Sequence, residues 1–293
     1  MKYTSLLICV LFSFSSPPRI PAFIVNDDIT TETPNIINHE IIENIRRRTL
    51  SLPNEYDPRN LIDPCLPAIM NQGSCGCCYV FSSAYVLSYR MCKATNSNVK
   101  FIPNTQELVT CDGYNKGCDG GDATMTFKYI EVYGVGARAC KDYNLSASLT
   151  SQLGTCTLNV CKNGTFTDSK YYCIKGSATF YRDYSFNSVN ILEQVIKEEV
   201  YTNWPVVTSI ISTDTNNYFS NYYTTEPNAI MTQASTNESA NTDHAVAIIG
   251  WGSAYWIIAN SWTSQWGYQG YAKIAKGIRK IATKAMFCTA QSS

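Results

Sequence analysis

The order of hydrophobic and polar residues predicts a helical first half of the chain. Over residues 78–92 the apolar side chains recur at the spacing of one helical face, which predicts a buried helix. Residues 104–109 and 123–133 predict two shorter helices, and Gly134 would end the second one. Residues 140–173 are polar and rich in cysteine, so we expect loops that disulfides hold in place.

The pattern changes near residue 175 and predicts a β-rich second half. Residues 190–201 have the periodicity of an amphipathic helix, and the polar stretch 213–241 is expected to be a surface loop. Four runs of β-branched and aromatic residues predict strands, at residues 206–211, 245–251, 255–259 and 271–274. We therefore predict an α+β fold with a helical half over about residues 65–175 and a β-rich half over about 176–285. A crevice between two such halves is where we expect a binding site.

Length and composition fit a globular protein with a substantial core. The chain has 293 residues, of which 45% are hydrophobic and 16% are charged. It carries 23 Lys and Arg against 23 Asp and Glu, so no bulk charge favours nucleic acid or an anionic membrane as a partner. After the N-terminal segment, no apolar run reaches the length of a membrane span.

The N-terminal segment predicts a leader and a short pro-region. Lys2 and the apolar run 6–14 are typical of a signal peptide over residues 1–16, although a buried first strand would show a similar pattern. Residues 17–51 are polar and end near three arginines at 46–48, which predicts a short, cleavable propeptide; a plain flexible arm is the alternative.

Cysteine content and glycosylation motifs favour an oxidising, secretory route. The chain has 13 cysteines, and Asn-x-Ser/Thr sequons begin at Asn144, Asn163 and Asn237. Sequons occur often by chance, so they add weight only together with the cysteines. We expect localisation in the secretory pathway, ending in a lysosome or vacuole or outside the cell.

Cys78 is the candidate nucleophile. It follows a glycine- and cysteine-rich loop and begins the predicted buried helix, where unpaired amides and the helix dipole favour a thiolate. A thiolate is the reactive form of cysteine. Three cysteines so close together are also typical of disulfide partners, and that is the interpretation we favour for Cys75.

His244 and Asn260 are the candidate partners of this thiol. The chain has two histidines, and His39 falls in the predicted propeptide, which leaves His244 for the processed protein. An imidazolium beside a thiol lowers the pKa of the thiol. The Asn260 oxygen could accept a hydrogen bond from one ring nitrogen and turn the other towards the thiol, and Trp262 could shield that bond from water.

Four segments resemble, in order, the motifs of the papain family of cysteine proteases, and most closely those of its cathepsin B group. The nucleophile loop is matched by Gln72-Gly73-Ser74-Cys75-Gly76-Cys77-Cys78 and the substrate-binding glycines by Cys118-Asp119-Gly120-Gly121. The histidine motif is matched by Asp243-His244-Ala245 and the asparagine motif by Asn260-Ser261-Trp262. The resemblance runs from about Leu52 to at least Gly277 and assigns residues 52–293 to a peptidase domain. It implies the papain-like two-domain fold: a helical, disulfide-rich left domain and a β-barrel-like right domain, with the active-site cleft between them.

The resemblance also implies roles for single residues. Cys78, His244, Asn260 and Gln72 would be catalytic, with the Gln72 amide as an oxyanion donor. Contacts with substrate would come from Gly120, Gly121, Asp243, Trp262 and Trp266. Cys75 would pair with Cys118 and Cys65 with Cys92. Polypeptide substrates and cystatin-type inhibitors are the implied partners of a monomer that needs no cofactor and no metal.

Three departures from the family pattern shape the functional prediction. No histidine lies between Cys78 and His244, whereas the cathepsin B group has an occluding loop with two histidines that hold a substrate's C-terminal carboxylate. This predicts an endopeptidase with little removal of C-terminal dipeptides. Cys77 replaces the usual serine and Tyr79 the usual tryptophan. No acidic residue follows Lys284, so the sequence does not support a preference for arginine at the second position before the cleaved bond.

These departures leave two alternative functions open. One is a catalytically inactive papain-like homologue that acts as a binding protein, and the other is a redox protein that uses Cys75-Gly76-Cys77-Cys78. The cysteine count also leaves one thiol besides Cys78 without a partner, for which Cys77 and Cys288 are the candidates.

Overall fold

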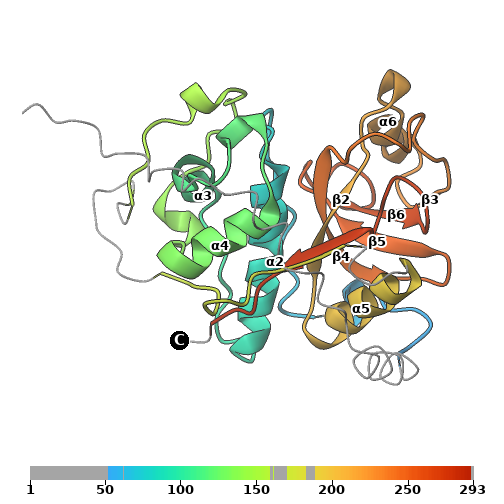
Figure 1. The fold of residues 1–293 in the computed structure, drawn as a ribbon, viewed down its shortest axis with the longest axis horizontal. Helices are drawn as coiled ribbons and strands as arrows, with labels where there is room; N and C mark the ends of the chain where they lie inside the picture. Colours follow the sequence, from blue (N-terminus) through green and yellow to red (C-terminus); the bar gives the residue numbers. More distant parts are fainter. Residues whose placement is uncertain (1–51, 62, 159–160, 162–169, 183–188, 292–293) are drawn as a thin grey trace, which may run out of the picture.

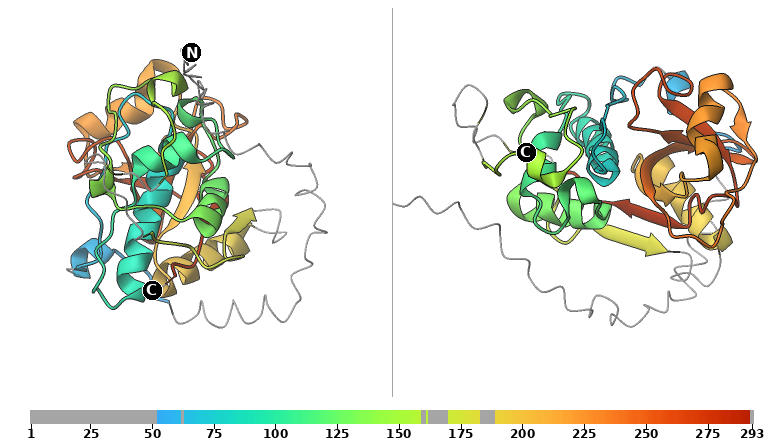
Figure 2. Two further views of the ribbon diagram at one scale, coloured as in Figure 1. Left: turned by 90° about the vertical axis from the view of Figure 1, so that its left-hand side faces the viewer. Right: turned by 90° about the horizontal axis from the view of Figure 1, so that it is seen from above.

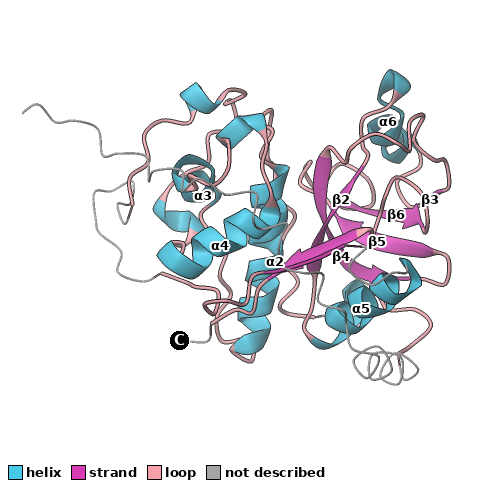
Figure 3. Cartoon of the chain, viewed as in Figure 1, coloured by secondary structure: helices cyan, strands magenta, loops and turns pink. Residues whose placement is uncertain are grey.

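The computed structural model describes residues 52–61, 63–158, 161, 170–182 and 189–291. The predicted signal peptide (1–16) and propeptide (17–51) lie outside the described residues. The described chain forms a helical half and a β-sheet half, which lie side by side in Figure 1. The helical segment comes first in the chain and the sheet second, as Figure 3 shows by secondary structure.

The helical half is built around the long helix α2. The helices are α2 (Cys78–Ala94), α3 (Thr105–Cys111) and α4 (Ala123–Tyr133), with single 3₁₀ turns at Gly117–Asp119, Arg138–Cys140 and Thr150–Gln152; a further 3₁₀ turn, Pro58–Leu61, lies against the sheet half. The start of α3 is capped by Asn104, whose side chain accepts a hydrogen bond from the N–H of Glu107. Gly134 ends α4 with φ of 64°, a conformation that favours glycine. The predicted helices at 104–109 and 123–133 therefore form close to their expected bounds.

A seven-stranded sheet with order β1-β7-β2-β4-β5-β6-β3 forms the second half. Its strands are β1 (Thr179–Arg182), β2 (Val206–Ile210), β3 (Ile230–Met231), β4 (His244–Trp251), β5 (Tyr255–Ala259), β6 (Tyr271–Ala275) and β7 (Lys284–Phe287). Neighbouring strands are antiparallel except β3 and β6. Helix α5 (Val189–Thr202) packs against β2 and β4.

Strand β4 is buried on both faces and joins the two halves. Ala245, Ala247 and Ile249 belong to the core cluster that contains the side chains of α2, and the alternating Val246 and Ile248 belong to the second core within the sheet half. Because successive strand residues point to opposite faces, one apolar run supplies both cores. Helix α2 lies along the boundary between the halves in Figure 1 and in the right-hand view of Figure 2.

Five disulfides lie within the described residues. The structure forms both bridges that the family resemblance implies, Cys65–Cys92 and Cys75–Cys118. It adds Cys111–Cys156, Cys140–Cys161 and Cys173–Cys288. The first two of these added bridges fasten the loops around residues 140–161 to the helical half. Cys77 and Cys78 are the free cysteines among the described residues, so the leftover thiol is Cys77 and not Cys288.

The stretch 213–241 differs from the sequence prediction. It was expected to be a surface loop, but it contains α6 (Tyr218–Thr225) and β3. Phe219 and Tyr223, four residues apart, place their rings in the core of the sheet half. The helix holds four aromatic residues, at 218, 219, 222 and 223, but the long Asn-, Thr- and Ser-rich stretch around them led to the loop prediction. Strands β1 and β7 were also not expected, and β7 extends the β-rich half past residue 285.

Candidate active site

The Cys78 thiol stands at the N-terminus of α2, facing the sheet half. Cys78 is the first residue of the helix, and the loop before it is fastened by the Cys75–Cys118 bridge. The N–H of Gly76 also donates to the carbonyl oxygen of Cys118 at 3.1 Å. A side chain at position 76 would collide with that oxygen, because a Cβ there would lie 2.4 Å away. Glycine at this position therefore permits the close approach of the two loops.

Cys78 and His244 shift each other's pKa in opposite directions. Burial raises the pKa of the Cys78 thiol, but the hydrogen bond and charge of His244 lower it more, so the pKa lies below that of an ordinary thiol. Burial lowers the pKa of His244, but the hydrogen bond and charge of Cys78 raise it above the usual value. This mutual shift favours a thiolate beside an imidazolium. Strand β4, which begins at His244, packs against α2 and so brings the two residues together.

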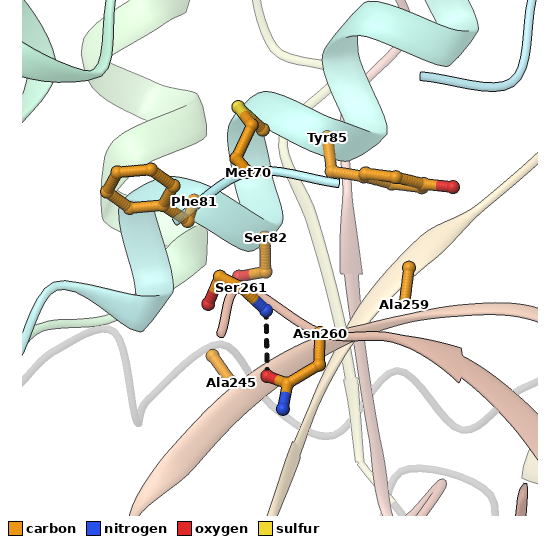
Figure 4. A pocket seen from close by; sticks show the side chains of 8 residues that line it. All are labelled: Met70, Phe81, Ser82, Tyr85, Ala245, Ala259, Asn260 and Ser261. Atoms are coloured by element: carbon orange, nitrogen blue, oxygen red, sulfur yellow. Dashed lines mark hydrogen bonds between the residues drawn. The ribbon is translucent and has the colours of Figure 1, made fainter. Parts of the chain in front are cut away.

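Asn260 determines which nitrogen of His244 faces the thiol. Oδ1 of Asn260 accepts the backbone N–H of Ser261 at 2.8 Å and lies 2.8 Å from Nε2 of His244. Because an oxygen that serves as acceptor needs a donor, Nε2 carries a proton and donates it to Oδ1. Nδ1 is then the nitrogen left for the hydrogen bond with Cys78. Figure 4 shows the bond from Ser261 to the Asn260 oxygen.

Trp262 covers the His244 ring. The two rings stack with centroids 4.6 Å apart and planes 28° apart. Phe219 and Trp266 hold Trp262 from behind, with ring centroids 6.1 and 5.4 Å away. The bond between His244 and Asn260 is therefore shielded from water, which strengthens it. Trp266 is only 8% exposed, so in this structure it supports Trp262, and its predicted contact with substrate would be small.

Gln72 is held between the two halves of the molecule. Its side-chain Nε2 donates to the carbonyl oxygen of Cys75 at 2.9 Å, and its Oε1 accepts from the Ser261 hydroxyl at 2.6 Å. One of the two protons on Nε2 is thus committed, and the other is available for a ligand. The first N–H groups of a helix have no partner within it, which leaves the N–H of Cys78 as a second donor. This pair is the candidate oxyanion hole.

The glycine pair Gly120-Gly121 forms an exposed edge beside the site. Gly120 has φ of +99°, and the side chain of Asn115 supports the loop by donating to the Asp122 carbonyl oxygen at 3.2 Å and accepting from its N–H at 2.7 Å. A Cβ at Gly121 would lie 2.4 Å from Oδ1 of Asn115. The backbone of this edge is therefore open to a ligand in front and closely packed behind.

Asp243 serves the fold in this structure. Its carboxylate accepts from the N–H and hydroxyl of Ser212 and from the N–H of Thr213. Burial raises the pKa of Asp243, but these hydrogen bonds lower it more, so the group stays charged. The carboxylate fixes the chain after β2 next to His244. A contact between Asp243 and substrate stays a prediction.

A small cavity of about 10 Å³ lies behind the site, between α2 and the sheet. It is lined by Met70, Phe81, Ser82, Tyr85, Ala245, Ala259, Asn260 and Ser261 (Figure 4). This volume is close to the lower limit for a single water molecule, so no substrate fits there. Nδ2 of Asn260 is buried without a hydrogen-bond partner among the described residues.

The sequence prediction missed three residues that support the site: Ser261, Tyr143 and Asn115. Ser261 lay within the asparagine motif, but only the structure shows that its hydroxyl binds Gln72. Tyr143 lies in the cysteine-rich stretch, where no periodic pattern points to it.

Among the described residues, no cluster of three His, Cys, Asp or Glu side chains could hold a metal ion.

Comparison with known proteins identifies the family. The model of the papain family of cysteine proteases matches residues 52–290. The chain belongs to this family. It is a cysteine-type peptidase by descent and by the arrangement of its site. The two-domain fold predicted from the sequence is confirmed by this match and by the structural likenesses below.

The curated relatives include cathepsin B-like proteins. The chain is 29% identical over 235 residues to cathepsin B-like CP2 of Giardia intestinalis, a match that covers 78% of this chain and 70% of the relative. It is also 29% identical over 241 residues to a gut-specific cysteine proteinase of Caenorhabditis elegans, again covering 78% and 70%. The predicted resemblance to the cathepsin B group is confirmed.

Solved structures show the same fold. The digestive procathepsin L2 proteinase of Tenebrio molitor superposes with a TM-score of 0.64 at 24% identity, covering 81% of this chain and 68% of that one. The cysteine protease CMS1MS2 of Carica candamarcensis, solved in complex with E-64, gives a TM-score of 0.62 at 22% identity, covering 83% and 100%. In the part of this chain that the structure describes, no helix has the length and apolar character of a membrane span.

Proposed function

We propose that the chain is an active endopeptidase that cuts polypeptides through a Cys78 thiolate and a His244 imidazolium. The observation that carries this proposal is an arrangement of three groups: the Cys78 thiol and the His244 ring are hydrogen-bonded to each other, and Oδ1 of Asn260 lies 2.8 Å from Nε2 of that ring. The intact set of thiol, imidazole and orienting amide supports an active enzyme over an inactive homologue.

The reaction would proceed in two half-reactions. The Cys78 thiolate attacks the scissile carbonyl carbon, and the oxygen becomes an anion bound by Gln72 Nε2 and the Cys78 N–H. His244 then donates its Nδ1 proton to the departing amine, which leaves an acyl-enzyme. In the second half, Nδ1 takes a proton from water, and the hydroxide releases the acid and the thiolate.

The adjacent thiols give the proposal its first test. Cys77 precedes α2, and its sulfur lies 3.2 Å from the Tyr143 hydroxyl oxygen, whereas the Cys78 thiol is hydrogen-bonded to His244. A peptidyl epoxide should label the wild-type protein and a Cys77→Ala variant, and it should not label Cys78→Ala. The wild type and Cys77→Ala should likewise hydrolyse a fluorogenic peptide, and Cys78→Ala should not. Labelling of Cys78→Ala, or no labelling of the wild type under reducing conditions, would contradict the proposal.

The absence of an intervening histidine gives a second test. Because no histidine lies between Cys78 and His244, the chain lacks the histidine pair that would hold a terminal carboxylate. Two peptides that differ only in a free or amidated C-terminus should therefore be trimmed at similar slow rates, while an internal bond in a longer peptide is cut faster. A strong preference for the free carboxylate would overturn the endopeptidase assignment.

The disulfides and the family are consistent with a secretory or lysosomal compartment. We propose that the partners of the protein in this compartment are polypeptides, which bind as substrates in the cleft between the two halves. The bridges would form in the oxidising compartment before the thiol meets its substrate.

A further inference from the structure

Cys77 is a buried free thiol with no role in the proposed reaction. It is 0% exposed, and its Sγ lies 3.2 Å from the hydroxyl oxygen of Tyr143. Burial raises the pKa of Cys77 to about 12, so the thiol keeps its proton throughout the range in which the protein would work. The neutral thiol is therefore a hydrogen-bond donor.

The direction of the hydrogen bonds follows from the number of protons. Tyr143 has one hydroxyl proton, and the carbonyl oxygen of Gln72, 2.8 Å away, can only accept. The Tyr143 proton is thus committed to Gln72, and its oxygen accepts the proton of Cys77. The bonds run in one direction, from Cys77 to Tyr143 to Gln72. The ring of Phe81 packs edge-on against Tyr143 at 4.9 Å and fixes its plane.

The same Gln72 is anchored from the sheet half by Ser261. The N–H of Gln72 donates to the Ser261 carbonyl oxygen at 3.0 Å, and Oε1 accepts from the Ser261 hydroxyl at 2.6 Å. Tyr143 binds the one remaining backbone group, the carbonyl oxygen, from the helical half. Without Tyr143 that oxygen would lose its partner, and the hydrogen bond from Gln72 Nε2 to the Cys75 carbonyl oxygen would be left to hold the residue from the helical half.

We propose that Cys77 and Tyr143 are positioning residues for the oxyanion hole: the bonds from Cys77 through Tyr143 to Gln72 set the place of the Gln72 amide. The proposal rests on the proposed function, in which Gln72 is an oxyanion donor. It also gives the cysteine that replaces the usual serine a task, because a thiol and a hydroxyl can both donate to Tyr143.

Variants at the two positions test the proposal by their effect on two reactions. Hydrolysis needs an oxyanion hole, whereas alkylation of Cys78 by iodoacetamide forms no oxyanion. Loss of a whole oxyanion donor costs about 10²–10³-fold in kcat. We therefore expect Tyr143→Phe to lower kcat by about tenfold, a fraction of that loss, with the rate and pH profile of alkylation unchanged. The kcat of Cys77→Ser should stay near that of the wild type, and the kcat of Cys77→Ala should fall between those of Cys77→Ser and Tyr143→Phe. Tyr268→Phe, on the surface, is the matched control.

A double-mutant cycle separates a positioning effect from a general loss of structure. Gln72→Ala should lower kcat at least a hundredfold. Adding Tyr143→Phe to this variant should lower kcat no further, because the side-chain amide that Tyr143 helps to position is gone. Additive losses, equal losses in hydrolysis and alkylation, or no loss in Tyr143→Phe would each overturn the proposal. If Tyr143→Phe does not fold, the comparison of Cys77→Ser with Cys77→Ala decides. Failure of the proposed function itself would appear earlier, as no hydrolysis by the wild type.

Discussion

Nε2 of His244 lies 2.8 Å from Oδ1 of Asn260, and that oxygen also accepts the backbone N–H of Ser261. The second bond fixes the orientation of the amide, so the imidazole has to donate from Nε2 and exchange protons at Nδ1. One amide therefore sets the tautomer of the only histidine among the described residues.

The pH dependence of activity follows from the pKa directions of the pair. The Cys78 thiolate forms as the pH rises through its lowered pKa, and the His244 imidazolium is lost as the pH rises through its raised pKa. Hydrolysis should thus show a bell-shaped profile, limited at low pH by formation of the Cys78 thiolate and at high pH by loss of the His244 imidazolium. In Asn260→Ala the hydrogen bond that helps to raise the His244 pKa is gone, so the upper limb should move to lower pH. Profiles of kcat/KM for both proteins test this, and an unmoved upper limb would contradict it.

Tyr79 supports the glycine edge from below. Its hydroxyl donates to the carbonyl oxygen of Gly117 at 3.0 Å, inside the core. Tyr79→Phe should lose about 1 kcal/mol of unfolding free energy and raise KM more than it lowers kcat, because the turn that carries Gly120 loses its anchor. Chemical denaturation and steady-state kinetics give both numbers. A change in kcat alone would place Tyr79 in the reaction and not beneath the binding edge.

Substitution of Gly121 should harm substrate binding through packing. A Cβ at this position would lie 2.4 Å from Asn115 Oδ1 and 2.8 Å from Tyr79 Cζ, so the edge must move outward. At Gly120 the same change meets open space but a strained backbone, since φ is +99°. Combining Gly121→Ala with Asn115→Ala should recover part of the lost affinity, whereas Gly120→Ala should gain nothing from it. Measured KM values for the four proteins check this.

Arg279 and Asp214 form a buried ion pair, and removing one partner should destabilise the sheet half. The atoms lie 2.7 Å apart with side chains 0% and 2% exposed. Arg279→Met would leave the Asp214 charge without its partner and should cost about 3–5 kcal/mol. Lys197→Met breaks the more exposed pair with Glu193 and should cost about 0.5 kcal/mol or less. Equal losses in the two variants would contradict this ranking.

The sequence was sufficient where a pattern is local. The helix from Ala123 to Tyr133 and the strand from Tyr255 to Ala259 form at their predicted bounds, because their periodicity and their glycine and polar boundaries lie within a few residues. The roles of Cys78 and His244 were predicted from ordered motifs, and the structure places these residues together.

The rest depends on contacts between distant residues. The hydrogen bond from Tyr143 to Gln72 spans 71 positions and that from Ser261 to Gln72 spans 189, and no spacing rule relates such positions. The short helix α6 exists because Phe219 and Tyr223 find a core supplied by the sheet. Bridges such as Cys173–Cys288 could not be paired from the number of cysteines alone.

The Cys75–Cys118 bridge has a consequence for handling the protein. It lies three residues from Cys78, the proposed nucleophile, and its two cysteines are only 1% and 7% exposed. A weak thiol reductant therefore reacts with Cys78 well before it reduces this disulfide. A strong reductant also breaks the disulfide, and the loop that carries Cys78 then loses its anchor. Peptidase activity should therefore appear only over a limited range of reductant strength. Below this range Cys78 stays oxidised, and above it the Cys75–Cys118 bridge is reduced.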